Sequence, residues 1–206
     1  KTVVTAADYA MLITNAIAAS ANLILAYCPT PIIVDPVTGA HAYMVRWCEW
    51  TVLAFLMTFV IEGVSASKVE EPASLALLML VSAGCGLVFP FCTSKLWWSF
   101  WMTVSFLTYF TIFPRWLRRR RIYLDSVEAC SSPSEVVQVV ANRVSASLMS
   151  ACCIMWTVIT LDYCVIWFAA VYQGDDFSRE GRPQWPFLLD AICDVCAKLV
   201  YAHYIS

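Results

Sequence analysis

The chain alternates between long apolar runs and short polar stretches. Six apolar runs stand out, at residues 9–27, 43–63, 73–92, 96–116, 144–172 and 185–205. Each is near or above the ~20 residues that a helix needs to cross ~30 Å of hydrocarbon. The pattern therefore predicts an all-α fold, a polytopic membrane helical bundle, with residues 1–206 forming a single transmembrane domain.

The composition supports a membrane protein. Of 206 residues, 61% are hydrophobic and 14% are charged, which is too apolar for an ordinary soluble domain. We therefore expect the lipid bilayer as a partner and no nucleic acid. The ten cysteines lie almost wholly inside the apolar runs, without the spacing of metal sites or disulfide scaffolds, so we interpret them as small core residues and expect no metal.

The distribution of positive charge predicts the orientation. If six helices alternate, one side of the membrane receives eight cations and the other three, and the first side is cytoplasmic by the positive-inside rule. That side includes the segment from Arg115 to Glu135, predicted as a loop. The loop either anchors the topology against anionic lipid or forms a docking surface for an associated or fused cytoplasmic effector.

Two apolar runs contain charged residues, which are costly inside a membrane and often functional. Asp194 and Lys198 are four residues apart, so their side chains share one helical face. Arg46 and Glu49 are three residues apart in the second run. From the residues alone, the first pair serves equally well as a structural ion pair or as a functional one. Glu49 needs a buried cation, for which Lys198 is the candidate.

A lysine in an apolar pocket can condense with an aldehyde to form a Schiff base. Once protonated, that imine requires nearby carboxylates, and Glu49 and Asp194 on separate helices would supply them. Aromatic side chains such as Trp50 and Trp98 would suit a long conjugated chromophore, although aromatic residues alone are more often core or interface residues than pocket residues.

The chain at this point resembles the microbial (type I) rhodopsins. Arg46-x-x-Glu49-Trp50 is similar to the family's third-helix motif, and Asp194-x-x-x-Lys198 to its seventh-helix motif. Three shorter segments fall in the right order. These are Gly84–Val88 (fourth helix), Trp97-Trp98 (fifth helix) and Tyr163–Trp167 (sixth helix).

The resemblance implies a seven-helix bundle of which helices two to seven are represented here, so the family's first helix is apparently absent from the sequence. It implies that Lys198 carries all-trans retinal and that Glu49 and Asp194 are counterions tuned by Arg46. It implies a pocket that includes five further residues: Trp50, Gly86, Trp98, Tyr163 and Trp167.

Three more positions depart from the family pattern. The sixth-helix tryptophan falls on Thr160, and Trp156 could replace it if the register shifts by one turn. Cys164 stands in place of the usual hinge proline. Asp162 is an additional intramembrane acid, interpreted first as a hydrogen-bonded core residue.

These features favour a light sensor over a pump or a channel. The family's outward proton pumps carry a donor eleven residues after the counterion, and that position is Val60. The first run lacks the glutamates typical of the family's cation channels. We therefore expect a photoreceptor that signals to a cytoplasmic or fused effector, without enzymatic activity of its own. A light-driven ion pump, a light-gated channel, a retinal-free six-helix transporter subunit and homo-oligomers stay open as alternatives.

Overall fold

The structure, a computed structural model, describes residues 6–39, 41–64, 72–129 and 136–172, together with residues 192, 193, 195 and 196. Its five α-helices are α1 (Ala6–Tyr27), α2 (Met44–Val64), α3 (Pro72–Gly84), α4 (Lys95–Ala129) and α5 (Val136–Tyr172). Strands β1 (Ile32–Val34) and β2 (His41–Tyr43) lie between α1 and α2. Two 3₁₀ turns, η1 (Cys85–Leu87) and η2 (Phe89–Phe91), follow α3.

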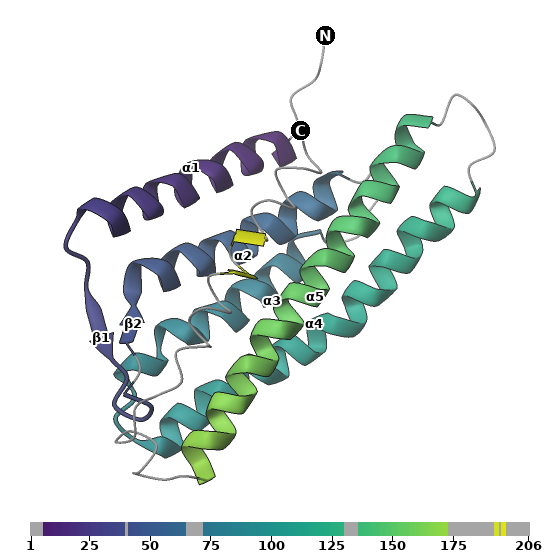
Figure 1. The fold of residues 1–206 in the computed structure, drawn as a ribbon. Coiled ribbons are helices and arrows are strands. Elements are labelled where there is room, and N and C mark those ends of the chain that lie inside the picture. The colour runs from purple at the N-terminus through teal and green to yellow at the C-terminus, as the bar shows by residue number, and fades with distance from the viewer. Residues whose placement is uncertain are drawn as a thin grey trace.

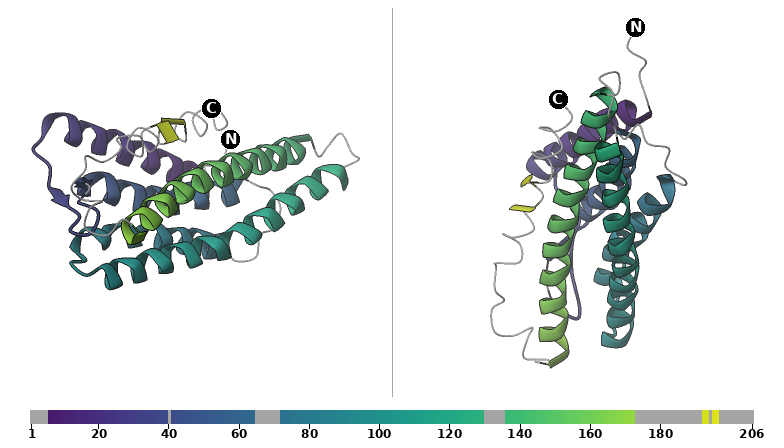
Figure 2. Two further views of the ribbon diagram at one scale, coloured as in Figure 1. Left: turned by 60° about the horizontal axis from the view of Figure 1, so that its bottom comes forward. Right: turned by 90° about the vertical axis from the view of Figure 1, so that its right-hand side faces the viewer.

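The helices lie side by side in one bundle (Figure 1 and Figure 2). Each helix packs on the next along the chain, and α5 also packs on α2. Within the described ranges, five helical segments are long and apolar enough to cross a membrane, one from each helix, the third continuing from α3 through η2. This confirms the all-α class and is consistent with a multi-pass membrane protein. The sixth predicted run, residues 185–205, lies outside the described residues except at four positions.

The connection between α1 and α2 is a β-hairpin that the sequence pattern did not predict. Ile32 pairs with Tyr43 and Val34 with His41 in antiparallel register. The Asp35 carboxylate closes the turn by accepting the backbone N–H groups of Val37 at 2.8 Å and Thr38 at 3.3 Å. Strands of three residues are too short to produce a recognisable alternation of apolar and polar positions.

The third apolar run is not one helix over residues 73–92, as its hydropathy predicted. α3 ends at Gly84, and the chain continues through the 3₁₀ turns η1 and η2. Gly84 and Gly86 weaken an α-helix, and Pro90 removes a backbone donor. The chain is therefore more tightly wound after Gly84, as two 3₁₀ turns in place of an α-helix.

The predicted loop from Arg115 to Glu135 is wrong for most of its length. α4 is a single helix through Ala129, and α5 begins at Val136 rather than near residue 144. Residues 130–135 lie outside the described part. The hydropathy criterion missed this part of the helix because hydropathy drops at the arginines. Arginine is nevertheless a good helix former. Its buried face continues in helical spacing through Ile112, Trp116 and Tyr123.

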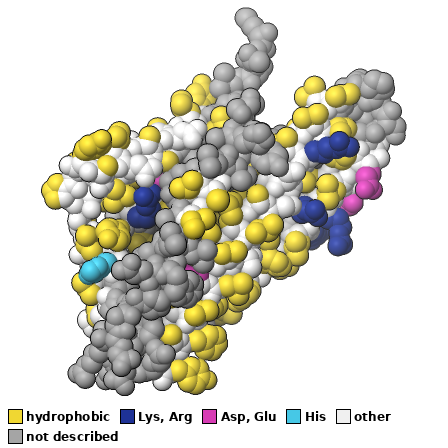
Figure 3. All heavy atoms as spheres, in the orientation of Figure 1, with side chains coloured by type: hydrophobic (Ala, Val, Ile, Leu, Met, Phe, Trp, Pro, Cys, Tyr) yellow, Lys and Arg dark blue, Asp and Glu magenta, His cyan; other side chains and the backbone are white. Residues whose placement is uncertain are grey.

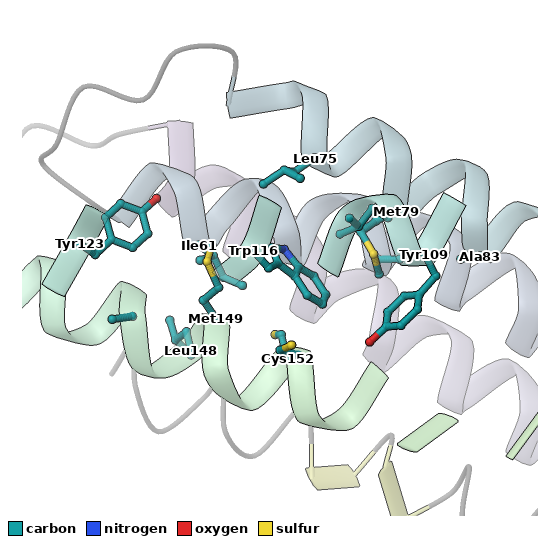
Figure 4. Close-up of a cluster of buried hydrophobic side chains, with 14 residues drawn as sticks. Ile61, Leu75, Met79, Ala83, Tyr109, Trp116, Tyr123, Leu148, Met149 and Cys152 are labelled. Carbon is teal, nitrogen blue, oxygen red and sulfur yellow. The ribbon is translucent and has the colours of Figure 1, made fainter. Parts of the chain in front are cut away.

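The main core lies between α2, α3, α4 and α5. Figure 4 shows side chains from these four helices converging on the indole of Trp116, which is 1% exposed. Ile61, Met79 and Met149 are packed in the same cluster. A second cluster near the hairpin includes Val37, Phe89, Trp98 and Met102.

The surface is apolar along the helices and charged at one end. Exposed large apolar side chains occur on every described helix, including Leu12, Val52, Leu77, Leu107 and Val165, as expected for residues that face lipid. In Figure 3, Lys and Arg side chains gather toward the end of the α4–α5 pair farthest from the hairpin. Exposed arginines at that end are Arg115, Arg118, Arg120, Arg121 and Arg143.

Candidate functional site

A partly buried ion pair lies on α2. The Arg46 Nη1 atom is 2.6 Å from the Glu49 Oε2 atom, at the i,i+3 spacing that places both side chains on one face of the helix. The Glu49 side chain is 1% exposed, whereas that of Arg46 is 29% exposed. Arg46 Nη2 also donates to Asn22 Oδ1 of α1 at 3.1 Å. The pair therefore joins α1 to α2 and brings a charge into an apolar interior.

This geometry gives Glu49 a cationic partner on its own helix. The sequence pointed to Lys198 as the buried cation that Glu49 needs, with Arg46 at the outer end of its helix. In the described part the guanidinium of Arg46 bonds directly to Glu49. Lys198 and Asp194 lie outside the described residues, so their predicted roles stay predictions.

An aromatic cavity of about 50 Å³ lies between α2, α3, α4 and α5. Rings from all sides form most of its wall, and the polar part of the wall comes from hydroxyl groups. The lining residues are Trp47, Trp50, Ser82, Ala83, Gly86, Phe89, Met102, Ser105, Phe106, Tyr109, Trp156, Ile159, Thr160 and Tyr163. Glu49 precedes Trp50 in the chain but is not part of the lining.

The indole of Trp47 lies directly on Gly86 at the wall of this cavity. A Cβ atom placed on Gly86 would be 2.8 Å from Trp47 Cη2 and closer still to Cε3 and Cζ3. The same indole makes edge contacts with Trp50, at 5.6 Å between ring centroids, and with Tyr163, at 5.8 Å. Trp47 thus connects α2 to η1 and α5, and only glycine at position 86 allows this contact.

The hydroxyl groups of the cavity wall are largely satisfied by the protein itself. Ser105 Oγ donates to the Ser82 carbonyl oxygen at 2.9 Å, and Ser82 Oγ donates to the Ser105 carbonyl oxygen at 3.1 Å. Tyr109 and Thr157 share a hydrogen bond of 2.7 Å between their hydroxyl oxygens. Because these groups bond across the α3–α4 and α4–α5 interfaces, they fix the helix positions, and the wall presents mainly ring faces and edges.

Three of the five additional pocket residues implied by the resemblance line the cavity: Trp50, Gly86 and Tyr163. Trp98 and Trp167 do not. Trp98 is 2% exposed, and its Nε1 donates to Asp35 Oδ2 at 2.9 Å, so it anchors the hairpin on α4. Trp167 Nε1 donates to Ser99 Oγ at 3.3 Å.

Several lining residues escaped sequence analysis. Trp47, Phe106 and Tyr109 belong to ordinary apolar runs, and nothing in their spacing separates a cavity wall from a lipid-facing surface. Thr160 and Trp156, one turn apart on α5, both line the cavity. Trp156 is therefore a tryptophan of α5 in the cavity wall, and its correspondence to the family's sixth-helix tryptophan stays a prediction.

Asp162 departs from its expected role. The residue is 3% exposed, yet neither carboxylate oxygen has a hydrogen-bond partner in the described structure. Its interpretation as a hydrogen-bonded core residue is therefore wrong for the part of the chain that is described. A buried carboxyl without partners is costly, so this position calls for an explanation.

The fold and site together define a helical bundle, consistent with a multi-pass membrane protein, with a partly open aromatic cavity and a partly buried ion pair near it. Comparisons with protein-family models, with curated proteins and with solved structures gave no match to this chain.

Proposed function

We propose that this protein is a light-sensing retinal protein of the microbial rhodopsin type. Retinal is linked through Lys198, with Glu49 and Asp194 as counterions, and a light-driven helix movement signals to a cytoplasmic or fused effector. The observation that carries the proposal is the buried Glu49, held by Arg46 on the same turn of α2 that contributes Trp47 and Trp50 to an aromatic cavity.

The residues around the cavity have the chemical character that a polyene ligand requires. Its rings suit a flat conjugated molecule, and its hydroxyl groups are already paired, so an apolar ligand would leave few protein hydrogen bonds unmade. Trp50, Gly86 and Tyr163 would hold the ligand. The cavity of about 50 Å³ is smaller than the ~300–1,000 Å³ of typical ligand cavities, so a side chain has to move to admit it.

Bound retinal would supply the visible absorption and the light-driven change of shape. The protein's own residues supply the charges and the fixed surroundings. Arg46 balances the carboxylate of Glu49, and its bond to Asn22 fixes the guanidinium against α1. A change in charge near Glu49 would therefore alter the contact between α1 and α2.

The residue at position 60, Val60, favours a sensor over an outward proton pump. This residue occupies the position where the resemblance places a proton donor, and it is 2% exposed. An apolar side chain there cannot pass a proton to the interior. The cytoplasmic output would involve the arginine-rich end of α4 and the start of α5, which form a helical pair in place of a loop.

The decisive test is a visible spectrum after expression with all-trans retinal. We expect a visible band in the wild-type protein that disappears in Lys198→Ala and persists in Lys95→Ala, a control at an exposed lysine. Absence of a band in the wild-type protein would refute the proposal and favour the retinal-free transporter. Light-driven ion flux in vesicles, at the rate of a pump, would replace the sensor by the pump or channel alternative.

A further inference from the structure

We propose that Trp47 is the side chain that closes the aromatic cavity, and that its indole turns away from Gly86 when the chromophore enters. This inference rests on the proposed function, because it concerns how a polyene reaches the same site. It assigns to Trp47 a role in ligand uptake and selection that neither the counterions nor the lysine can perform.

The position of Trp47 carries the inference. Its indole occupies the space over Gly86 so closely that a single additional carbon would overlap the ring. The indole is flat and conjugated, as a polyene is. It contacts two further rings, Trp50 and Tyr163, that the ligand would also touch. Trp47 thus fills the surface that a flat ligand would use.

The volume of the cavity supports the same conclusion. At about 50 Å³ the cavity is far smaller than the ~300–1,000 Å³ of typical ligand cavities. Three other wall residues have less freedom to move, since Ser82 is bonded to Ser105 across the α3–α4 interface and Tyr109 to Thr157 across the α4–α5 interface. The Trp47 side chain is only partly buried and contacts its neighbours through ring edges. Among the partly buried wall residues, Trp47 is the one whose indole covers Gly86.

The expected consequence is kinetic. Two ring contacts hold the indole in place, so the open position is a minor population, and uptake from a minor population is slowed in proportion to its fraction. Removing the indole should therefore accelerate uptake by about tenfold or more. Trp47→Phe should give an intermediate rate, because the smaller ring leaves part of Gly86 uncovered.

The experiment uses the retinal-free protein in lipid nanodiscs and two probes. All-trans retinol has the polyene but no aldehyde, so its uptake, followed by energy transfer from tryptophan, does not depend on Lys198. All-trans retinal reports the linked form through its visible band. Trp97→Ala, which removes an exposed indole on α4, is the matched control for the loss of a tryptophan.

Faster uptake of both probes in Trp47→Ala than in Trp97→Ala would support the inference. Equal rates within twofold, with a visible band in every variant, would overturn the role of Trp47 and leave the proposed function intact. Retinol uptake accelerated by Trp47→Ala without a visible band in any variant would support the role of Trp47 while removing the retinal linkage. Failure of every variant to take up either probe would overturn both.

A separate readout tests the movement itself. With 5-fluorotryptophan incorporated, the fluorine resonance of Trp47 is assigned by its loss in Trp47→Phe. We expect this resonance to move on addition of retinol, and the resonance of buried Trp116, which lies outside the cavity lining, to stay in place. A Trp47 resonance that does not move while retinol binds would overturn the proposal.

Discussion

Replacing Gly86 by alanine tests the packing of the aromatic site without any ligand. The new methyl carbon would be 2.8 Å from Trp47 Cη2 and nearer to two other ring carbons, closer than side chains pack, so the indole has to leave. Overpacking of this kind typically costs about 1–3 kcal/mol. Loss of the contacts with Trp50 and Tyr163, at ~0.5–1.5 kcal/mol each, leads to the same range.

The chain offers a matched control two residues away. A Cβ atom on Gly84 would meet only Thr51 Cγ2, at 3.7 Å, which is an ordinary contact, and Gly84 has helical angles of φ −63° and ψ −27°. Gly84→Ala should therefore be neutral or stabilising by up to ~1 kcal/mol. The difference between the two variants isolates the contact with Trp47 from the general effect of adding a methyl group.

The assay is a double-mutant cycle on the free energy of unfolding, measured for the retinal-free protein by titration with a denaturing detergent. We expect Gly86→Ala to be strongly destabilising in the wild-type background and much less so in Trp47→Phe or Trp47→Ala, with a coupling of about 1–2 kcal/mol. The reasoning is refuted if Gly86→Ala behaves like Gly84→Ala, or if its cost is unchanged when the indole is absent.

Two further predictions concern the charged groups and use the same unfolding assay. Arg46→Leu should cost ~3–5 kcal/mol because it leaves the Glu49 carboxylate, 1% exposed, without its guanidinium, and Glu49→Gln in the same chain should recover a large part of that loss. A loss below ~1 kcal/mol would mean that another cation serves Glu49 equally well. Asp162→Leu should raise the free energy of unfolding by ~1–3 kcal/mol because both of its carboxylate oxygens lack a partner among the described residues. A decrease would show that Asp162 has a stabilising partner and would contradict the assignment.

The described helices were predictable, and their ends were not, for a physical reason. Hydropathy detects apolar stretches, so it found the apolar part of each helix but stopped at residue 116, before the four consecutive arginines of α4. The continuing buried stripe of Trp116 and Tyr123 was a helical signal, but it is sparse and lies among four consecutive arginines. The hairpin was missed because its register depends on the Asp35 turn and on Trp98, which is far away in sequence.

The site was predictable only where residues on one helix interact. The i,i+3 spacing of Arg46 and Glu49 was sufficient to indicate their bond. The predicted approach of Lys198 to Glu49 lies outside the described residues and stays a prediction. The cavity depends on which faces of α2, α3, α4 and α5 meet. No spacing within a single run encodes the contact of Trp47 with Gly86, which are 39 positions apart in the printed sequence.

The length of α4 has a mechanical consequence. Its 35 residues form one continuous helix about 50 Å long, with Trp98 near one end and the arginines and Tyr123 toward the other. Pro114 lies inside this helix and removes one intrahelical hydrogen bond, so it is the point where the helix can bend. A helix of this length acts as a lever when it tilts as one piece, and a tilt of ~5° around the Trp98 end would displace the far end by ~4–5 Å. Because α5 packs along α4 and Arg120 donates to Ser150 Oγ at 2.7 Å, the two helices would move together. A small displacement in the interior would thus be amplified at the polar end.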